Sequence, residues 1–360
     1  MTTATINPTR ERPAWATALD PYSRPVAWRT WLDIFTSIVP YVALSVATYF
    51  LLDVSYWLVL AVAIPAAGFL LRTFILFHDC THGSLFESRR ANNAWGVGLG
   101  LVVMHPFSNW RWSHAFHHGS AGDLDRRGQG DVPTLTVAEW QAASPVGKAG
   151  YWLFRHPAVM FTIGPLWSLV IGPRIPPKNS SKKLVRSVHL TNLALLFLVG
   201  GICVLIGPID YLLIQAPTVF LAGAAGVWLF YVQHQFEDVY WENADEWKYE
   251  EAALQGSSYL RLPQPLQFFT GNIGLHHVHH LNARIPNYNL QRAHDDNEIF
   301  HSVPVLSFWD GIKATRLKLW DEERGRLVTF AQARRNARRA PSEALGLGDR
   351  AASQRAVRTE

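Results

Sequence analysis

The sequence predicts an all-α integral membrane protein, with four transmembrane helices in two hairpins and a cytoplasmic helical cap that carries a histidine-rich metal site. Three observations predict this class. Apolar residues make up 49% of the 360 residues and concentrate in four long runs, whereas charges concentrate near the two ends and in one central block. Lys and Arg are concentrated in the segments that the predicted hairpins place on one side of the membrane. Nine of the 15 histidines fall into three clusters.

Each of the four apolar runs is long enough to cross a bilayer, because a spanning helix needs about 20 mostly apolar residues. The runs are residues 34–52, 56–77, 188–206 and 211–232. Two short links join them in pairs, and each link contains an Asp but no Lys or Arg. The runs therefore predict two helical hairpins.

The basic residues predict the orientation of the hairpins. Lys and Arg precede the first run and fill the segment between the second and third runs. Because cytoplasmic loops carry an excess of Lys and Arg, we expect both termini and the central segment in the cytoplasm. This distribution accounts for the net charge of +5 without nucleic acid as a partner, since no nucleic-acid-binding motif is present.

Three segments are expected along the chain. Residues 1–30 form an N-terminal cytoplasmic segment, residues 31–320 the membrane domain, and residues 321–360 a basic C-terminal tail at the membrane surface. Two shorter apolar stretches, residues 94–107 and 158–172, are predicted not to span, because runs of this length are more often buried or interfacial. A crossing by either stretch alone would also place the histidine clusters on opposite sides of the membrane.

The three histidine clusters have the spacing of metal ligands. Residues three and four apart share a face of a helix, so each cluster directs two or three imidazoles toward one point. The clusters are HDCTH with His78 and His82, HAFHH with His114, His117 and His118, and HHVHH with His276, His277, His279 and His280. His234 follows the fourth run. All of these positions lie on one face of the membrane in the predicted topology, as a single shared site requires.

The number of imidazoles indicates two metal ions. Eight of the nine cluster histidines, all except His277, or nine histidines when His234 is added, exceed what one ion takes. Imidazole suits zinc, copper, iron and nickel, so ligand type alone does not identify the metal. Two adjacent ions with open positions are best suited to oxygen activation by a pair of irons. With only two cysteines, the chain has too few thiolates for a zinc site built on sulfur.

The sequences HDCTH, HAFHH and HHVHHLNARIPNY resemble the three histidine boxes of the membrane fatty acid desaturase superfamily, and the chain is most similar to the bacterial and plastid acyl-lipid omega-6 (Δ12-type) enzymes. The resemblance runs from about Trp31 to Trp309. It implies two iron ions, molecular oxygen as co-substrate, and insertion of a cis double bond into an acyl chain carried on a membrane lipid or as a thioester. It also implies an electron donor such as ferredoxin or a cytochrome with its reductase.

The same resemblance assigns the site residues. It implies metal ligation by His78, His82, His114, His117, His118, His234, His276, His279 and His280. His277 does not match a usual ligand. Because it lies three residues before His280, it could substitute for His276 or support it, and we expect the supporting role. Asp79 stands beside a ligand histidine and could orient it, and the same holds for Glu237 and Asp238. The isolated histidines His105, His156, His189, His294 and His301 are predicted to be structural.

Three other functions compete with a desaturase. A membrane hydroxylase or ketolase that acts on fatty acids or carotenoids would share the same iron pair. A membrane zinc protease would need the Glu of HExxH, where HDCTH has the shorter Asp, and would leave the other two clusters unexplained. A metal transporter or bis-histidine haem protein would place its ligands inside the spans.

Overall fold

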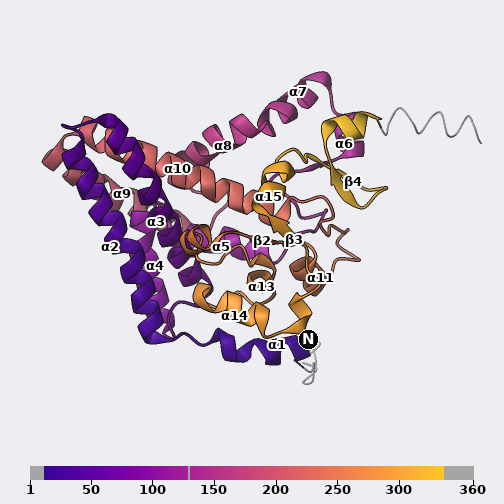
Figure 1. Ribbon diagram of the computed structural model, residues 1–360. Coiled ribbons are helices and arrows are strands. Elements are labelled where there is room, and N and C mark those ends of the chain that lie inside the picture. The colour runs from indigo at the N-terminus through magenta and orange to yellow at the C-terminus, as the bar shows by residue number, and fades with distance from the viewer. Residues whose placement is uncertain (1–11, 129, 336–360) are drawn as a thin grey trace, which may run out of the picture.

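The computed structural model describes residues 12–128 and 130–335, and it contains four helices long and apolar enough to span a membrane (Figure 1). They are α2 (Ala27–Leu51), α3 (Tyr56–His82), α9 (Lys182–Ile206) and α10 (Pro208–His234). The four predicted spans and the mostly helical fold class are confirmed. The helices are longer than the apolar runs. Helices α3 and α10 continue to the histidines that follow their runs, and α2 and α9 begin before theirs.

The two hairpins pack through α3 and α10. Helix α3 packs against both α2 and α10, and half of its most apolar window is buried, whereas only 6% of the corresponding window of α9 is buried. Glycine joins α9 to α10, since Gly207 has a φ of 88°, a conformation that other residues rarely adopt. Large apolar side chains on α2 and α9 remain exposed, as lipid-facing residues do.

The two shorter apolar stretches form shorter helices that are not among the four candidate spans. Residues 94–107 fall mainly in α4 (Arg89–Val102), which is followed by α5 (Phe107–His118). Residues 158–172 fall in α8 (Pro157–Pro165) and a π-helical segment, Leu166–Ile171. In Figure 1, α7 (Pro145–Phe154) and α8 form an arm that extends outward beside α10.

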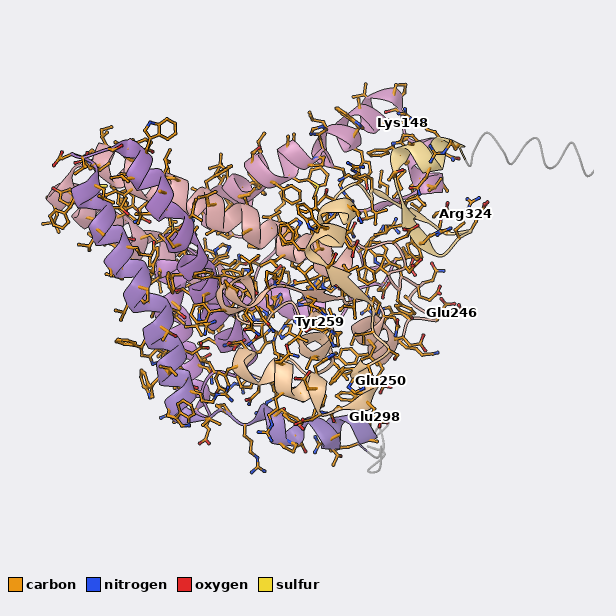
Figure 2. The ribbon with its side chains drawn as sticks, viewed as in Figure 1. Lys148, Glu246, Glu250, Tyr259, Glu298 and Arg324 are labelled. Atoms are coloured by element: carbon orange, nitrogen blue, oxygen red, sulfur yellow. The ribbon has the colours of Figure 1, made fainter. Side chains whose placement is uncertain are left out.

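Residues 235–335 form the cap, which packs on the ends of α3 and α10 (Figure 1). Its helices are α11 (Tyr249–Leu254), α12 (Gln264–Phe269), α13 (His276–Leu281), α14 (Leu290–Asp295) and α15 (Phe308–Ala314). A buried apolar cluster surrounds α13 and joins Ile75 of α3 to Leu19 of α1 (Ala14–Leu19). Figure 2 shows the charged side chains of Glu246, Glu298 and Arg324 on the side of the molecule away from the hairpin links. The cap therefore fixes α13 against the membrane helices.

Two small sheets complete the described structure. Strand β2 (Tyr259–Arg261) pairs in parallel with β3 (Val305–Ser307). Strand β4 (Leu319–Asp321) lies between β1 (Leu135–Thr136), to which it is parallel, and β5 (Arg326–Val328), to which it is antiparallel. Helix α6 (Val137–Ala142) follows β1.

The start of the C-terminal tail differs from the prediction. A tail was expected from residue 321, but Leu327 and Val328 are buried in β5, so the β4–β5 hairpin continues the folded domain. Strands of three residues are too short to show an alternating pattern in the sequence. The rest of the predicted tail, from residue 336, and residues 1–11 of the predicted N-terminal segment lie outside the described residues.

Candidate metal centre

The structure brings the nine predicted ligand histidines together in two adjacent groups. The five-histidine group contains His78, His82, His114, His118 and His279. The four-histidine group contains His117, His234, His276 and His280. Within each group, one nitrogen from every imidazole lies within 4.8 Å of all the others. The two groups touch, because the rings of His118 and His280 stack with centroids 4.1 Å apart.

Helix geometry divides the histidines between the groups. On α5, His114 and His118 are one turn apart and enter the five-histidine group, while His117 is rotated by about 100° from His118 and enters the other. On α13, His276 and His280 enter the four-histidine group and His279 the five-histidine group. The last turn of α3 supplies His78 and His82, and the end of α10 supplies His234. Helices α5 and α13 therefore serve both groups.

The nitrogen atoms are spaced like neighbouring ligands of one ion. Facing Nε2 atoms are 2.9 to 3.1 Å apart in both groups. Ligands at right angles around an ion with metal–nitrogen bonds of about 2.1 Å would have this spacing. The Nε2 atoms of His82 and His280 are buried and lack a hydrogen-bond partner among residues 12–128 and 130–335. Buried donors and acceptors are seldom left alone, so a bound metal fits these atoms.

Burial keeps five of the ligand imidazoles neutral. It lowers the pKa well below 6.5 for His114, His118, His276, His279 and His280, and the neighbouring histidines lower it further. A neutral imidazole has one nitrogen with a free lone pair. The donor set is therefore ready for metal at neutral pH.

Two imidazoles of the four-histidine group form a hydrogen bond at Nδ1, the ring nitrogen that does not face the site. The Nδ1–H of His117 donates to the carboxylate of Asp131, and the Nδ1–H of His234 donates to the backbone oxygen of Gly256 at 3.0 Å. A hydrogen bond at Nδ1 fixes the ring and leaves Nε2 as the ligand atom. Neither partner was predicted from the sequence, and no motif marks either of them. Only the fold brings them to the histidines.

Asp79 has a second role besides its contact with a histidine. One carboxylate oxygen lies 3.5 Å from Nδ1 of His78, longer than a normal hydrogen bond. The other accepts the backbone N–H of Asn287 at 2.9 Å and its side-chain N–H at 3.0 Å. Asn287 also donates to Asp33, which pairs with Arg72. This buried network ties α2 and α3 to the segment after α13.

The other candidate acids do not face the histidine groups. Glu237 and Asp238 are exposed, and Glu237 pairs with Arg326 at 3.1 Å. His277 is rotated by about 100° around α13 from His276 and belongs to neither group; its Nε2 is 3.0 Å from Nδ1 of His294. His294 is thus not isolated, although the sequence suggested that it was. His294 is 17 residues from His277, so helical spacing could not predict their contact.

Comparisons with known proteins agree with this geometry. The family model described as fatty acid desaturase matches residues 55–302, a range that includes all nine histidines. The chain is 41% identical over 309 residues to a fatty acid desaturase of Bacillus subtilis, covering 86% of this chain and 88% of that protein. It is 25% identical to the chloroplastic omega-6 fatty acid desaturase of Arabidopsis thaliana, over 75% of this chain and 61% of the relative. It is also 25% identical to the sn-1 oleoyl-lipid 12-desaturase of Anabaena variabilis, over 74% of this chain and 75% of the relative.

Proposed function

The chain belongs to the fatty acid desaturase family, and we propose that it uses two iron ions and molecular oxygen to insert a cis double bond into an acyl chain of a membrane lipid. The observation that carries this proposal is the pair of touching imidazole groups, with five and four nitrogens. The family and the names of the relatives favour desaturation over the hydroxylase or ketolase alternative.

The donor set supports iron over zinc. A structural zinc site usually has four ligands in a tetrahedron. The five-histidine group offers one nitrogen more than such a site takes, and the two groups lie side by side. When bound, two irons would supply the oxygen activation that removes two hydrogens from adjacent carbons. The histidines hold the ions, and Asp131 and Gly256 fix the orientation of His117 and His234.

The position of the site suits a lipid substrate and a soluble electron donor. Both groups lie at the ends of the spanning helices α3 and α10, under the cap. An acyl chain would come from the membrane side, and a ferredoxin or cytochrome with its reductase would approach from the aqueous side. Relatives named as oleoyl-lipid 12-desaturases favour a monounsaturated lipid substrate, with the acyl chain on a glycerolipid.

The distribution of Lys and Arg supports a cytoplasmic position for the cap and both termini. Single cysteines introduced at Asp210, in the helix-joining region, and at Asp238, in the cap, test this orientation in a chain with Cys203→Ser. A membrane-impermeant reagent added to intact cells should label the cysteine at 210 and leave the one at 238 unlabelled. The reverse pattern would place the cap outside the cytoplasm.

Product analysis tests the reaction. The chain is expressed in a host rich in monounsaturated lipids, with ferredoxin and its reductase, and derivatised fatty acids are analysed by mass spectrometry. We expect diunsaturated acyl groups with the new cis bond on the methyl side of the existing one. The matched control is His118→Ala, which should produce none. A hydroxy acid or an oxidised carotenoid as the main product would contradict the proposal, as would protein that holds one zinc and no iron.

A further inference from the structure

A pocket outside the metal centre lies where α6 and α7 meet the residues that follow β5. Its volume is about 530 Å³, and its lining comprises Trp140, Gln141, Lys148, Ala149, Trp152 and Arg334. None of these residues belongs to either histidine group. Figure 2 shows Lys148 on the arm at the outer end of α7. The pocket is therefore a separate feature of the molecule.

Among the described residues, the pocket carries positive charge and no neutralising acid. Lys148 and Arg334 both lie over the ring of Trp140, at 5.9 and 5.6 Å from its centroid. The Lys148 ammonium donates to the backbone oxygen of Gln141 at 2.8 Å. Neither cation forms an ion pair with a carboxylate of the described residues. Two cations on one ring repel each other, so an anion between them would be favoured.

A buried donor in the pocket wall has no acceptor. Trp140 is only 7% exposed, and its indole N–H has no hydrogen-bond partner within the part of the chain that the structure describes. A buried indole N–H normally finds an acceptor. Phosphate oxygens would accept from the two cations, and they would reach this N–H only after a shift of Trp140, because its indole nitrogen is closed to the pocket. The chemistry of the wall thus fits a phosphate group.

The surroundings of the pocket identify the source of that phosphate. Helix α7 exposes apolar side chains on several sides, namely Val146, Trp152, Leu153 and Phe154, with exposures of 82%, 50%, 55% and 47%. This apolar surface continues onto α8 and the π-helical segment through exposed Ile163, Leu166 and Trp167. Apolar side chains with Trp and basic residues at their edge are typical of helices that lie in a membrane interface.

The arm is firmly joined to the membrane helices. Arg155, at the end of α7, is fully buried and donates to Tyr231 at 3.1 Å and to Gln235 at 2.8 Å, both at the end of α10. Figure 1 shows the arm beside α10. Because α10 is long and apolar enough to span the bilayer, a junction at its end would hold the arm near the membrane surface. We propose that the pocket binds the phosphate of an anionic phospholipid of the adjoining leaflet, with the lipid chains beside the apolar face of α7.

Lipid binding to the purified full chain in detergent tests this proposal. The probe is dioctanoyl phosphatidylglycerol, and native mass spectrometry counts the bound molecules. We expect one specific molecule per chain. Lys148→Gln with Arg334→Gln should weaken binding at least about tenfold, because two charge-assisted contacts are lost. The matched control removes the same charge at the start of α9, with Lys182→Gln and Lys183→Gln, and should retain binding. Trp140→Phe should cause a smaller loss.

Three results would overturn the proposal. Equal binding of dioctanoyl phosphatidylcholine would mean that the net charge of the lipid is not recognised. Competition by inorganic phosphate at the same concentration would make the pocket a site for free phosphate. An equal loss in both double variants would indicate a general effect of basic residues. Because the measurement requires no turnover, its outcome is independent of the proposed desaturase reaction.

Discussion

The five-histidine and four-histidine groups have the same kind of ligand but are held differently. All imidazoles of the four-histidine group are buried, whereas His82 and His118 of the five-histidine group are partly exposed. In the four-histidine group, Asp131 and Gly256 fix two rings through Nδ1. The nearest acid to the five-histidine group, Asp79, instead binds Asn287. The five-histidine group thus relies on its larger number of ligands. The four-histidine group relies on hydrogen bonds at Nδ1 that fix the orientation of two of its rings.

The largest effect should come from removing one ligand from each group. His276→Ala leaves three imidazoles in the four-histidine group, while His279→Ala leaves four in the other. Each change should lower turnover by more than about 100-fold, because the geometry of both ions controls the reaction. Metal analysis should show a greater loss of metal in His276→Ala, since that group starts with fewer ligands.

The control for both variants is His301→Ala, which removes an exposed histidine outside the groups and should leave metal content and turnover unchanged. Full iron content in His276→Ala together with metal loss in His279→Ala would reverse the comparison. It would show that hydrogen bonds at Nδ1 of the ligand rings contribute more to metal retention than the number of ligands does.

A smaller effect should follow from removing the carboxylate behind His117. Asp131→Asn preserves size but loses the charged acceptor, and loss of such a partner typically costs about 10- to 100-fold in metal affinity. Release of metal to a chelator should therefore become faster for one of the two ions, while the other is released at the original rate. Asp238→Asn is the matched control, because Asp238 is close in sequence to His234 but is exposed and does not face the groups. Equal acceleration of both ions would contradict a role confined to the four-histidine group.

The comparison also shows what the sequence could predict. Spacings of three and four residues identified eight of the nine histidines that the structure gathers, because the helical repeat places them on one face. His234 was assigned from the resemblance to known desaturases and from its position after the fourth run. The same spacing could not divide them between two groups, since that depends on how α5 and α13 meet α3 and α10. Asp131, Gly256 and Asn287 were missed because each meets its partner only through tertiary folding. Glu237 and Asp238, which are close in sequence to His234, lie away from the groups.

The smallest effect is on the pH dependence of stability and comes from His105, a buried histidine outside both groups. Its contribution can be compared with the acid sensitivity of the ligand histidines. His105 is 5% exposed, and its Nδ1 lies 3.0 Å from the backbone oxygen of Val103. Burial lowers its pKa from 6.5 to about 4. Below pH 6.5 the unfolded chain therefore takes up a proton that the folded chain does not. The stability that this histidine contributes is complete above pH 6.5 and is lost as the pH falls toward 4.

Between pH 7 and 5.5, this one group should lower the free energy of unfolding by about 1 kcal/mol. His105→Asn retains a donor for the oxygen of Val103 but cannot titrate. Between pH 7 and 5.5, the free energy of unfolding of this variant should therefore fall by about 1 kcal/mol less than that of the unchanged chain. Denaturant unfolding of both proteins in detergent at the two pH values measures the difference, and the ligand histidines cancel because both chains contain them. His301→Asn, at an exposed position, should behave like the unchanged chain. If His105→Asn loses as much stability as the unchanged chain, His105 takes up its proton without unfolding, and acid sensitivity would have to be assigned to the two histidine groups alone.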